Sequence, residues 1–257
     1  MLSPEIMARY QEWLNADWCD AATKTELQNL QKNEKELEDR FYCDLEFGTG
    51  GMRGLLGAGT NRMNIYLIRR LTQALADCIS DHGEAAKARG VAISYDSRRF
   101  SREFALETAL VLAANGIKAY LFAELRPTPT LSFAVREKQA IAGVMVTASH
   151  NPKEYNGYKV YWEDGGQLPP EQADVIIAKM QQRNTWQIAV ADKEQALNQG
   201  LLEIMGPELD DAYVAKVHEQ MLNHQMTAAR GANLNLVYTP LHGTGTKLVE
   251  RILRENG

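Results

Sequence analysis

Cysteine is scarce in this sequence of 257 residues. Cys19, Cys43 and Cys78 are far apart and lack Cys-x-x-Cys spacing, so they indicate neither a disulfide scaffold nor a zinc site. A surplus of basic residues is also missing, because 28 Lys and Arg stand against 33 Asp and Glu, a net charge of −5. This balance argues against a binder of nucleic acid or of anionic membrane surfaces. A local group of cations would have to hold any anionic ligand.

Long apolar runs are absent as well. No stretch approaches the roughly 20 apolar residues of a membrane span, and Glu5 lies where a secretory signal would be basic and then apolar. The sequence therefore predicts a cytoplasmic protein without a membrane segment. Its composition, 45% hydrophobic and 24% charged, is typical of a globular protein that buries a core.

The first 45 residues are predicted to form a helical preface to the rest of the chain. Apolar residues recur at helical spacing through residues 2–14 and again through 33–42. The same pattern predicts a further amphipathic helix over residues 61–82, which Gly83 would end.

Beyond residue 90, short apolar runs alternate with helical stretches. Strands are predicted at Val91–Tyr95, Ala119–Phe122 and Ala142–Val146, with helices at residues 101–115 and about 128–138. Continuous apolar strands are buried on both faces, which predicts an α/β fold with a mostly parallel or mixed sheet sandwiched by helices. Such sheets bind ligands beyond the carboxyl ends of their strands, so residues that follow a strand are functional candidates.

The remaining chain is predicted to divide near Met205-Gly206-Pro207. A strand at residues 158–162 and a helix through Met180 complete a first domain, residues 1–205. Residues 206–257 then predict, in order, a helix at about 210–223, a strand at 234–239, a turn at 240–245 and a helix at 246–255. One strand and one helix cannot close a sheet, so this part is interpreted as the truncated start of a second domain.

Ser149 is the candidate nucleophile. The strand Ala142–Val146 leads directly into Thr147-Ala148-Ser149-His150-Asn151-Pro152, which places the Ser149 hydroxyl at the carboxyl edge of the sheet; a turn-capping serine is the structural alternative. A hairpin-like turn would bring Lys159 back beside Ser149, where partial burial or nearby cations could lower its pKa and make it a base. His150 could hydrogen-bond a phosphate or a sugar, or it could be a capping or core histidine.

Two other motifs bring cations to the same edge. Phe47–Gly54 is predicted to be a flexible glycine-rich loop whose backbone N–H groups and Arg53 could bind phosphate. Arg98 follows the first strand, although it could instead be a surface arginine held by Asp96. A Ser-His-Asp hydrolase is disfavoured because Ser149 lacks the Gly-x-Ser-x-Gly context. A serine among arginines and a lysine suits a phosphoserine dianion, which indicates phosphoryl transfer.

Together these motifs resemble those of the α-D-phosphohexomutase superfamily. The resemblance rests on Phe47–Gly54, Tyr95–Arg98, Thr147–Pro152, Asn156–Lys159 and Thr239–Gly243. The helical preface and the run Asn61-Arg62-Met63-Asn64 are similar to the long phosphoglucomutase and phosphomannomutase branch, which includes phosphopentomutases. The resemblance covers nearly the whole chain and identifies it as the N-terminal portion of such an enzyme.

This resemblance implies a role for each motif residue. Ser149 would be the phosphorylated serine, and one oxygen of its phosphate would bind Mg²⁺. Arg53 and Lys159 would act as acid/base or charge-stabilising groups, with His150 lining the site. Two further family-motif residues, Arg98 and His242, would bind substrate or its phosphate.

The implied reaction moves a phosphoryl group between C1 and C6 of a hexose phosphate through a sugar bisphosphate intermediate, which also serves as activator. Phosphopentomutase, sugar-bisphosphate synthase and a non-catalytic phosphosugar-binding fragment stay open as alternatives. The Asp-Gly-Asp-x-Asp-Arg metal loop, the sugar-selecting loop and a second phosphate-binding loop that the resemblance implies are missing from the sequence. The chain alone is therefore predicted to hold Mg²⁺ poorly and to be inactive. The sequence predicts neither the sugar nor the oligomeric state.

Overall fold

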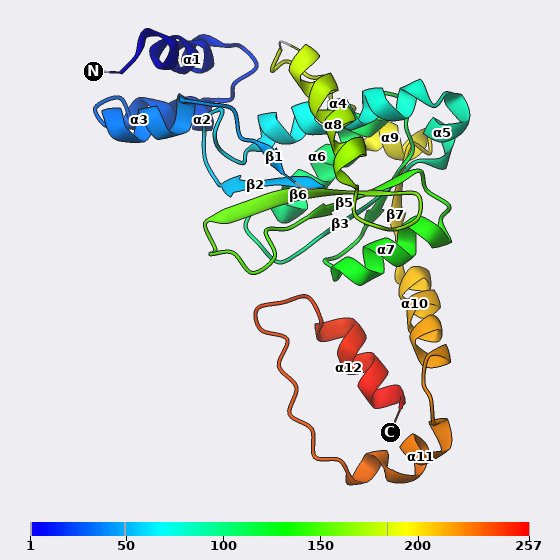
Figure 1. The fold of residues 1–257 in the computed structure, drawn as a ribbon. Coiled ribbons are helices and arrows are strands. Elements are labelled where there is room, and N and C mark those ends of the chain that lie inside the picture. The colour runs from blue at the N-terminus through cyan, green and yellow to red at the C-terminus, as the bar shows by residue number, and fades with distance from the viewer. Residues whose placement is uncertain (1, 49, 184, 257) are drawn as a thin grey trace.

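A computed structural model describes residues 2–48, 50–183 and 185–256. Its body is a seven-stranded mixed sheet in the order β1-β2-β6-β5-β3-β4-β7 (Figure 1). The parallel strands are β5 (Ala142–Val146), β3 (Val91–Tyr95), β4 (Ala119–Phe122) and β7 (Leu202–Met205), and the antiparallel strands are β6 (Tyr155–Trp162), β2 (Gly51–Leu55) and β1 (Phe47–Gly48). The α/β fold and the three strands predicted after residue 90 are confirmed.

Helices cover both faces of this sheet. One face carries α4 (Ile65–Asp81), α5 (Glu84–Arg89), α6 (Ser101–Ala114), α8 (Pro170–Gln182) and α9 (Lys193–Asn198), and the other carries α7 (Thr128–Glu137) and α10 (Pro207–Glu219). Alternate residues of β3 enter different cores, since Ile93 packs with the first layer and Ala92 with the second. Burial on both faces explains why the sequence of β3 is continuously apolar.

The helical preface is confirmed as α1 (Pro4–Asn15), α2 (Ala21–Asn29) and α3 (Glu34–Phe41). Side chains of Ser3, Asp20 and Asn33 accept hydrogen bonds from backbone N–H groups in the first turns of these helices, which is the usual way in which a helix N-terminus is capped. Trp13 of α1 is fully buried, and its ring lies edge-on to that of Trp186, 5.0 Å away between centroids. The preface is thereby packed onto the body of the protein.

The glycine-rich segment Phe47–Gly54 is not a flexible loop, as the sequence suggested. Its described residues form the hairpin of β1 and β2, while Thr49 lies outside the described part of the chain. β2 then pairs along its whole length with β6. The prediction was wrong because glycine in this segment allows close approach of backbones, which a sequence pattern does not distinguish from a loop.

The strand predicted at residues 234–239 is also wrong. After α11 (His224–Arg230) and a 3₁₀ turn at Gly231–Asn233, residues 234–240 run without secondary structure, and Val237 is 99% exposed. Among the described residues, none forms a ladder with this segment, and a strand exists only when its backbone groups are paired. The helix predicted at its end is confirmed as α12 (Thr246–Glu255).

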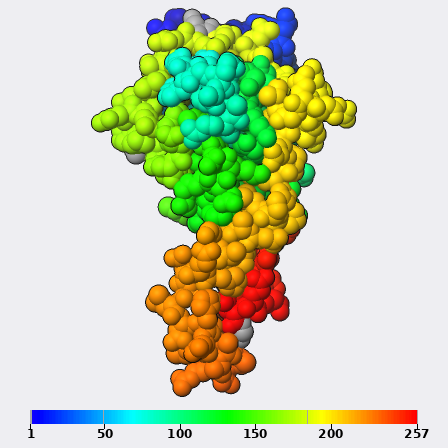
Figure 2. Space-filling view, turned by 90° about the vertical axis from the view of Figure 1, so that its right-hand side faces the viewer, coloured from blue at the N-terminus to red at the C-terminus, as the bar shows by residue number. Residues whose placement is uncertain are grey.

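After the first turns of α10, where Leu209 packs into the second core, the chain extends away from the sheet. Figures 1 and 2 show α10, α11 and α12 as an elongated projection from the α/β body. The predicted helix at about 210–223 is α10, which begins earlier, with Pro207 in its first turn, and ends at Glu219. Among the described residues, every helix is too short or too polar to cross a membrane.

Candidate active site

Ser149 lies in the loop that directly follows β5. β5 ends at Val146, and residues 147–154, which we name the serine loop, connect it to the antiparallel β6. Ser149 has a φ of 56°, in the left-handed region that residues with a side chain seldom adopt. Its side chain is exposed at the carboxyl edge of the sheet, as the sequence predicted.

Lys159 is brought to Ser149 by the return of β6. The register of the β5–β6 ladder pairs Met145 with Lys159, and the Lys159 ammonium donates a hydrogen bond of 2.9 Å to Ser149 Oγ. The pKa of Lys159 is lowered, first by burial of its side chain and then by the charge of Arg53. Both effects disfavour the ammonium form, so a larger fraction of this lysine than of a solvated one is neutral at a given pH, and only the neutral amine can act as a base.

Arg53 reaches the site from β2. Its residue pairs with Gly157 in the β2–β6 ladder, while Gly51 pairs with Lys159. Arg53 and Lys159 are therefore diagonal neighbours on the same face of two adjacent strands, which lie close enough for their side chains to interact. The Arg53 side chain is exposed and can meet an anion at the Ser149 hydroxyl.

A cavity of about 610 Å³ opens beside the serine loop. It is lined by Ser149 and His150 of the loop, by Arg98 after β3 and by His242 from the distant C-terminal segment. Ser97 donates a hydrogen bond to the His242 carbonyl oxygen, 3.3 Å away, and so holds that segment against the site. Of the six residues that the sequence singled out, these four line the cavity, while Lys159 contacts Ser149 from β6 and Arg53 lies beside Lys159 on β2.

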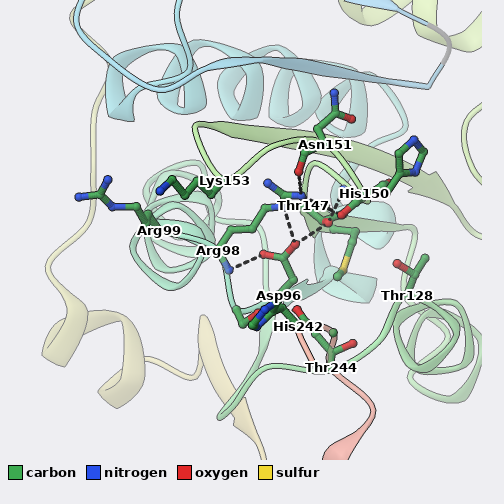
Figure 3. A pocket seen from close by; sticks show the side chains of 14 residues that line it. Asp96, Arg98, Arg99, Thr128, Thr147, His150, Asn151, Lys153, His242 and Thr244 are labelled. Atoms are coloured by element: carbon green, nitrogen blue, oxygen red, sulfur yellow. Dashed lines mark hydrogen bonds and ion pairs between the residues drawn. The ribbon is translucent and has the colours of Figure 1, made fainter. Parts of the chain in front are cut away.

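Further cations line the same cavity. Arg99 and Lys153 are exposed there, and Figure 3 shows both near Arg98 on one side of the cavity, with His150 on another. Lys153 was not among the candidates predicted from the sequence, although it follows the motif proline Pro152 directly. Such a surrounding favours a ligand with negative charge.

Arg98 points its guanidinium into the serine loop rather than into open solvent (Figure 3). It donates hydrogen bonds to four backbone carbonyl oxygens, those of Ser149, Asn151, Pro152 and Tyr155, over 2.5–3.1 Å. Its Nε lies 3.4 Å from a carboxylate oxygen of Asp96. Phosphate binding by Arg98 therefore stays a prediction that its present contacts do not favour.

Thr147 and Asp96 are functional candidates that sequence reasoning missed. The Thr147 hydroxyl donates to Asp96 at 2.6 Å and accepts from the backbone N–H of Ser149 at 2.9 Å. Asp96 also accepts from the hydroxyl of Ser101 at 2.7 Å. A threonine two residues before the serine was a visible signal, since its hydroxyl can accept from the N–H two residues on.

The described residues alone do not fit a complete Mg²⁺ site. Among them, no three side chains of His, Cys, Asp or Glu gather into a possible metal site. Asp96, whose carboxylate lines the cavity, already accepts from Thr147, Ser101 and the Arg98 backbone N–H. Mg²⁺ requires near-octahedral oxygen coordination, so a phosphate on Ser149 would supply one ligand and most others would have to come from elsewhere.

Comparison with known proteins identifies the body of the fold. The family model for the alpha/beta/alpha domain I of phosphoglucomutase/phosphomannomutase matches residues 44–186. The crystal structure of a Thermus thermophilus protein assigned as a phosphomannomutase superposes with a TM-score of 0.67 at 28% identity, over 82% of this chain and 43% of that one. Paramecium parafusin, a phosphoglucomutase in its open form, shares the fold with a TM-score of 0.60 at 17% identity, over 82% of this chain and 42% of that one.

Several curated relatives are similar at the sequence level. Phosphoglucomutase of Staphylococcus haemolyticus is 39% identical over 84% of this chain and 38% of its own length. Human glucose 1,6-bisphosphate synthase is 34% identical over 96% of this chain and 40% of its length, and the Probable phosphoribomutase of Schizosaccharomyces pombe is 34% identical over 98% and 43%. The chain thus spans about two fifths of the length of these relatives.

Proposed function

The chain belongs to the phosphoglucomutase/phosphomannomutase family, and on this basis we propose that it carries the phosphoserine of a phosphosugar mutase. Ser149 accepts a phosphoryl group from a sugar bisphosphate and returns it to a sugar monophosphate. The substrate is a hexose phosphate whose phosphate moves between C1 and C6. The observation that supports this best is the 2.9 Å contact between Lys159 Nζ and Ser149 Oγ, in a lysine whose pKa is lowered by burial and by Arg53.

The proposed transfer conserves its proton and its bonding electrons. Ser149 Oγ attacks the phosphorus of the bisphosphate, the Oγ–P bond forms and the P–O bond to the sugar breaks. Neutral Lys159 takes the hydroxyl proton of Ser149, and the departing sugar oxygen keeps the bonding electron pair and takes a proton from water. In the return step, the oxygen of a sugar hydroxyl forms a bond to the phosphorus and releases its proton to water. The Oγ–P bond breaks, and Lys159 gives its proton back to Oγ.

Three other side chains stabilise charge and bind the anion. Arg53 supports the negative charge that develops on the transferred group, and His150 contacts the phosphate or the sugar from the cavity side. His242, exposed in the same cavity, binds the substrate. Phosphoryl transfer depends mainly on positioning and charge stabilisation, and these residues offer both.

The proposal includes Mg²⁺, but this chain would supply only part of its coordination. The resemblance to the family implies this ion, and a phosphate on Ser149 would contribute an oxygen ligand. Because the described residues do not complete the coordination, we infer that the 257-residue chain by itself does not catalyse the isomerisation. We also propose that residues 1–205 form one domain and residues 206–257 the beginning of another.

Activity assays must decide which sugar phosphate is the substrate. The relatives named above are a phosphoglucomutase, a glucose 1,6-bisphosphate synthase and a phosphoribomutase, so phosphopentomutase and bisphosphate synthase are the alternative activities within the family. A non-catalytic fragment that binds phosphosugar is the alternative of another class. Activity assays with glucose, mannose and ribose phosphates distinguish the alternative activities within the family. A non-catalytic fragment would show no activity in any of these assays.

Phosphorylation of Ser149 is the decisive test. The protein as it occurs in the cell, called the native protein below, is incubated with glucose 1,6-bisphosphate. Peptide mass spectrometry should find one added phosphate on the peptide that contains Ser149. Ser149→Ala should lose both the phosphate and the turnover. Ser80→Ala is the matched control, because Ser80 lies on α4 and its hydroxyl donates to the Ala76 carbonyl of the same helix. Phosphate on another residue, or full turnover in Ser149→Ala, contradicts the proposal.

A further inference from the structure

We propose that Arg98, Asp96 and Thr147 form a clamp that fixes the backbone of the serine loop, and that Arg98 is a positioning residue rather than a phosphate ligand. The inference deepens the proposed function and rests on it for the meaning of Ser149. The contacts themselves are properties of the fold. They link the ends of two parallel strands, β3 and β5, to the loop that carries the nucleophile.

The hydrogen-bonding capacity of Arg98 carries the argument. A guanidinium has five N–H donors and no acceptor. The two terminal nitrogens make four bonds, two each, to the backbone carbonyls of Ser149, Asn151, Pro152 and Tyr155. The remaining donor, at Nε, faces Asp96. Because four donors are bonded to backbone carbonyls, Nε lies 3.4 Å from Asp96 and the side chain is only 13% exposed, Arg98 is poorly placed to bind a substrate phosphate.

Asp96 connects this guanidinium to the backbone of Ser149. One carboxylate oxygen accepts from the Arg98 backbone N–H and from the Ser101 hydroxyl, and the other accepts from the Thr147 hydroxyl. The oxygen of Thr147 accepts in turn from the N–H of Ser149. Both sides of residue 149 are therefore tied, its N–H through Thr147 and its carbonyl through Arg98.

The conformation of Ser149 explains why such ties are needed. Its φ of 56° belongs to a region in which a side chain is disfavoured, and such conformations persist only where the surroundings enforce them. Without the clamp, the loop is free to relax to ordinary φ values and to turn Oγ away from Lys159. A nucleophile displaced by about 1 Å loses about 10²-fold in rate.

Variants of Thr147 and Arg98 test the clamp through the rate at which glucose 1,6-bisphosphate phosphorylates Ser149 in the native protein. Thr147→Val keeps the shape but removes the hydroxyl, and should lower the maximal rate constant about 10²-fold with the half-saturating concentration nearly unchanged. Thr147→Ser restores the hydroxyl and should recover most of the rate. Arg98→Lys should behave like Thr147→Val, because an ammonium cannot reach four carbonyls at once. Arg102→Lys, on the exposed face of α6, is the control.

An unchanged rate constant with a tenfold higher half-saturating concentration in Arg98→Lys would identify Arg98 as a phosphate ligand and overturn the inference. Amide hydrogen exchange of the 257-residue chain gives a readout that does not need any activity. Residues 149–155 should exchange at least tenfold faster in Thr147→Val than in the wild-type protein or Thr147→Ser, while α4 is unchanged. Equal exchange in all three proteins refutes the clamp. Absence of phosphorylation in the wild-type protein refutes the proposed function alone.

Discussion

At the scale of residues, the site depends on Lys159, whose charged form is disfavoured both by burial and by a neighbouring arginine. The Lys159 ammonium is partly buried on β6, and Arg53 adds a second positive charge from the neighbouring strand. An isolated lysine in this position would only bind phosphate. The lowered pKa instead allows Lys159 to exchange a proton with the oxygen that it contacts.

Replacing Lys159 by Met should separate proton transfer from binding. A general base contributes roughly 10²–10⁴-fold to the rate, so kcat of the native protein should fall within that range while KM changes little. Steady-state kinetics with a sugar 1-phosphate measure both quantities. A raised KM with an intact kcat would instead assign Lys159 to substrate binding.

The pH dependence of Ser149 phosphorylation should follow the same lysine. The rate should rise with pH as Lys159 loses its proton, with a midpoint below the ordinary lysine value of 10.5. Arg53→Gln removes the neighbouring charge, so it should move the midpoint towards higher pH. Rates measured from pH 6 to 10 on both proteins decide this, and coinciding midpoints would exclude Arg53 as a cause of the lowered pKa.

Stability should show the matching sign. A lysine whose pKa is lower in the folded than in the unfolded state binds fewer protons when folded, so it destabilises the fold at neutral pH and does so less as pH rises. Lys159→Met should therefore be more stable than the wild-type protein near pH 7, and the difference should shrink above the folded pKa. Urea unfolding at a series of pH values tests this; a less stable variant at pH 7 would contradict it.

At the scale of elements, the β2–β6 contact places Arg53 beside Lys159. The backbones approach so closely at Gly51 that a Cβ there would lie 2.5 Å from the Tyr158 carbonyl oxygen. Gly51→Ala should therefore destabilise the protein by about 1–3 kcal/mol, as overpacking does, and lower activity by moving β2 away. Gly48→Ala is the matched control, since a Cβ at Gly48 meets only the Gly51 carbonyl at 3.7 Å. Equal denaturation midpoints for the two variants would refute this close contact.

How far the sequence predicts these elements depends on where their stability comes from. β3, β4 and β5 were predicted with their observed bounds because two-sided burial makes each run apolar throughout. β7 was missed, since it is a four-residue edge strand that includes the charged Glu203. The hairpin at Phe47–Gly54 was missed because its strands depend on pairing with β6, a contact distant in the sequence.

In the candidate site, too, some contacts could be predicted from the sequence and others could not. The Ser149–Lys159 contact was predictable because β5 and β6 follow each other in the chain and pair antiparallel, which brings Lys159 back to the end of β5. The four hydrogen bonds from Arg98 to backbone carbonyls were not predictable, because they depend on the path of the serine loop, and above all on the left-handed conformation of Ser149. The sequence was enough to find the motif residues, but the structure was needed to distinguish their roles.

At the scale of the whole molecule, one buried ion pair joins the α/β body to α10. Arg126, which follows β4, donates bonds of 2.7 and 2.5 Å to the two carboxylate oxygens of Asp210, and both side chains are buried. Asp210→Asn should cost about 3 kcal/mol, because it leaves the buried guanidinium with the more exposed carboxylate of Glu124, 3.5 Å away, as its remaining acidic partner. Asp211→Asn breaks an exposed pair with Arg251 and should cost at most about 1 kcal/mol. Chemical denaturation of these adjacent variants compares them directly, and similar losses would refute the distinction.

The segment 234–238 should govern how the 257-residue chain associates. Leu234, Leu236 and Val237 are 69%, 55% and 99% exposed in an extended stretch that makes no ladder with any described strand. An extended apolar segment with unpaired backbone groups is a template for pairing with another chain. Sedimentation velocity should therefore show concentration-dependent self-association of the wild-type chain, and Val237→Lys should reduce it by adding a charge to each new pairing. Arg230→Lys, on α11, should change nothing, and a wild-type chain that stays monomeric at high concentration would show that this segment is not an association site.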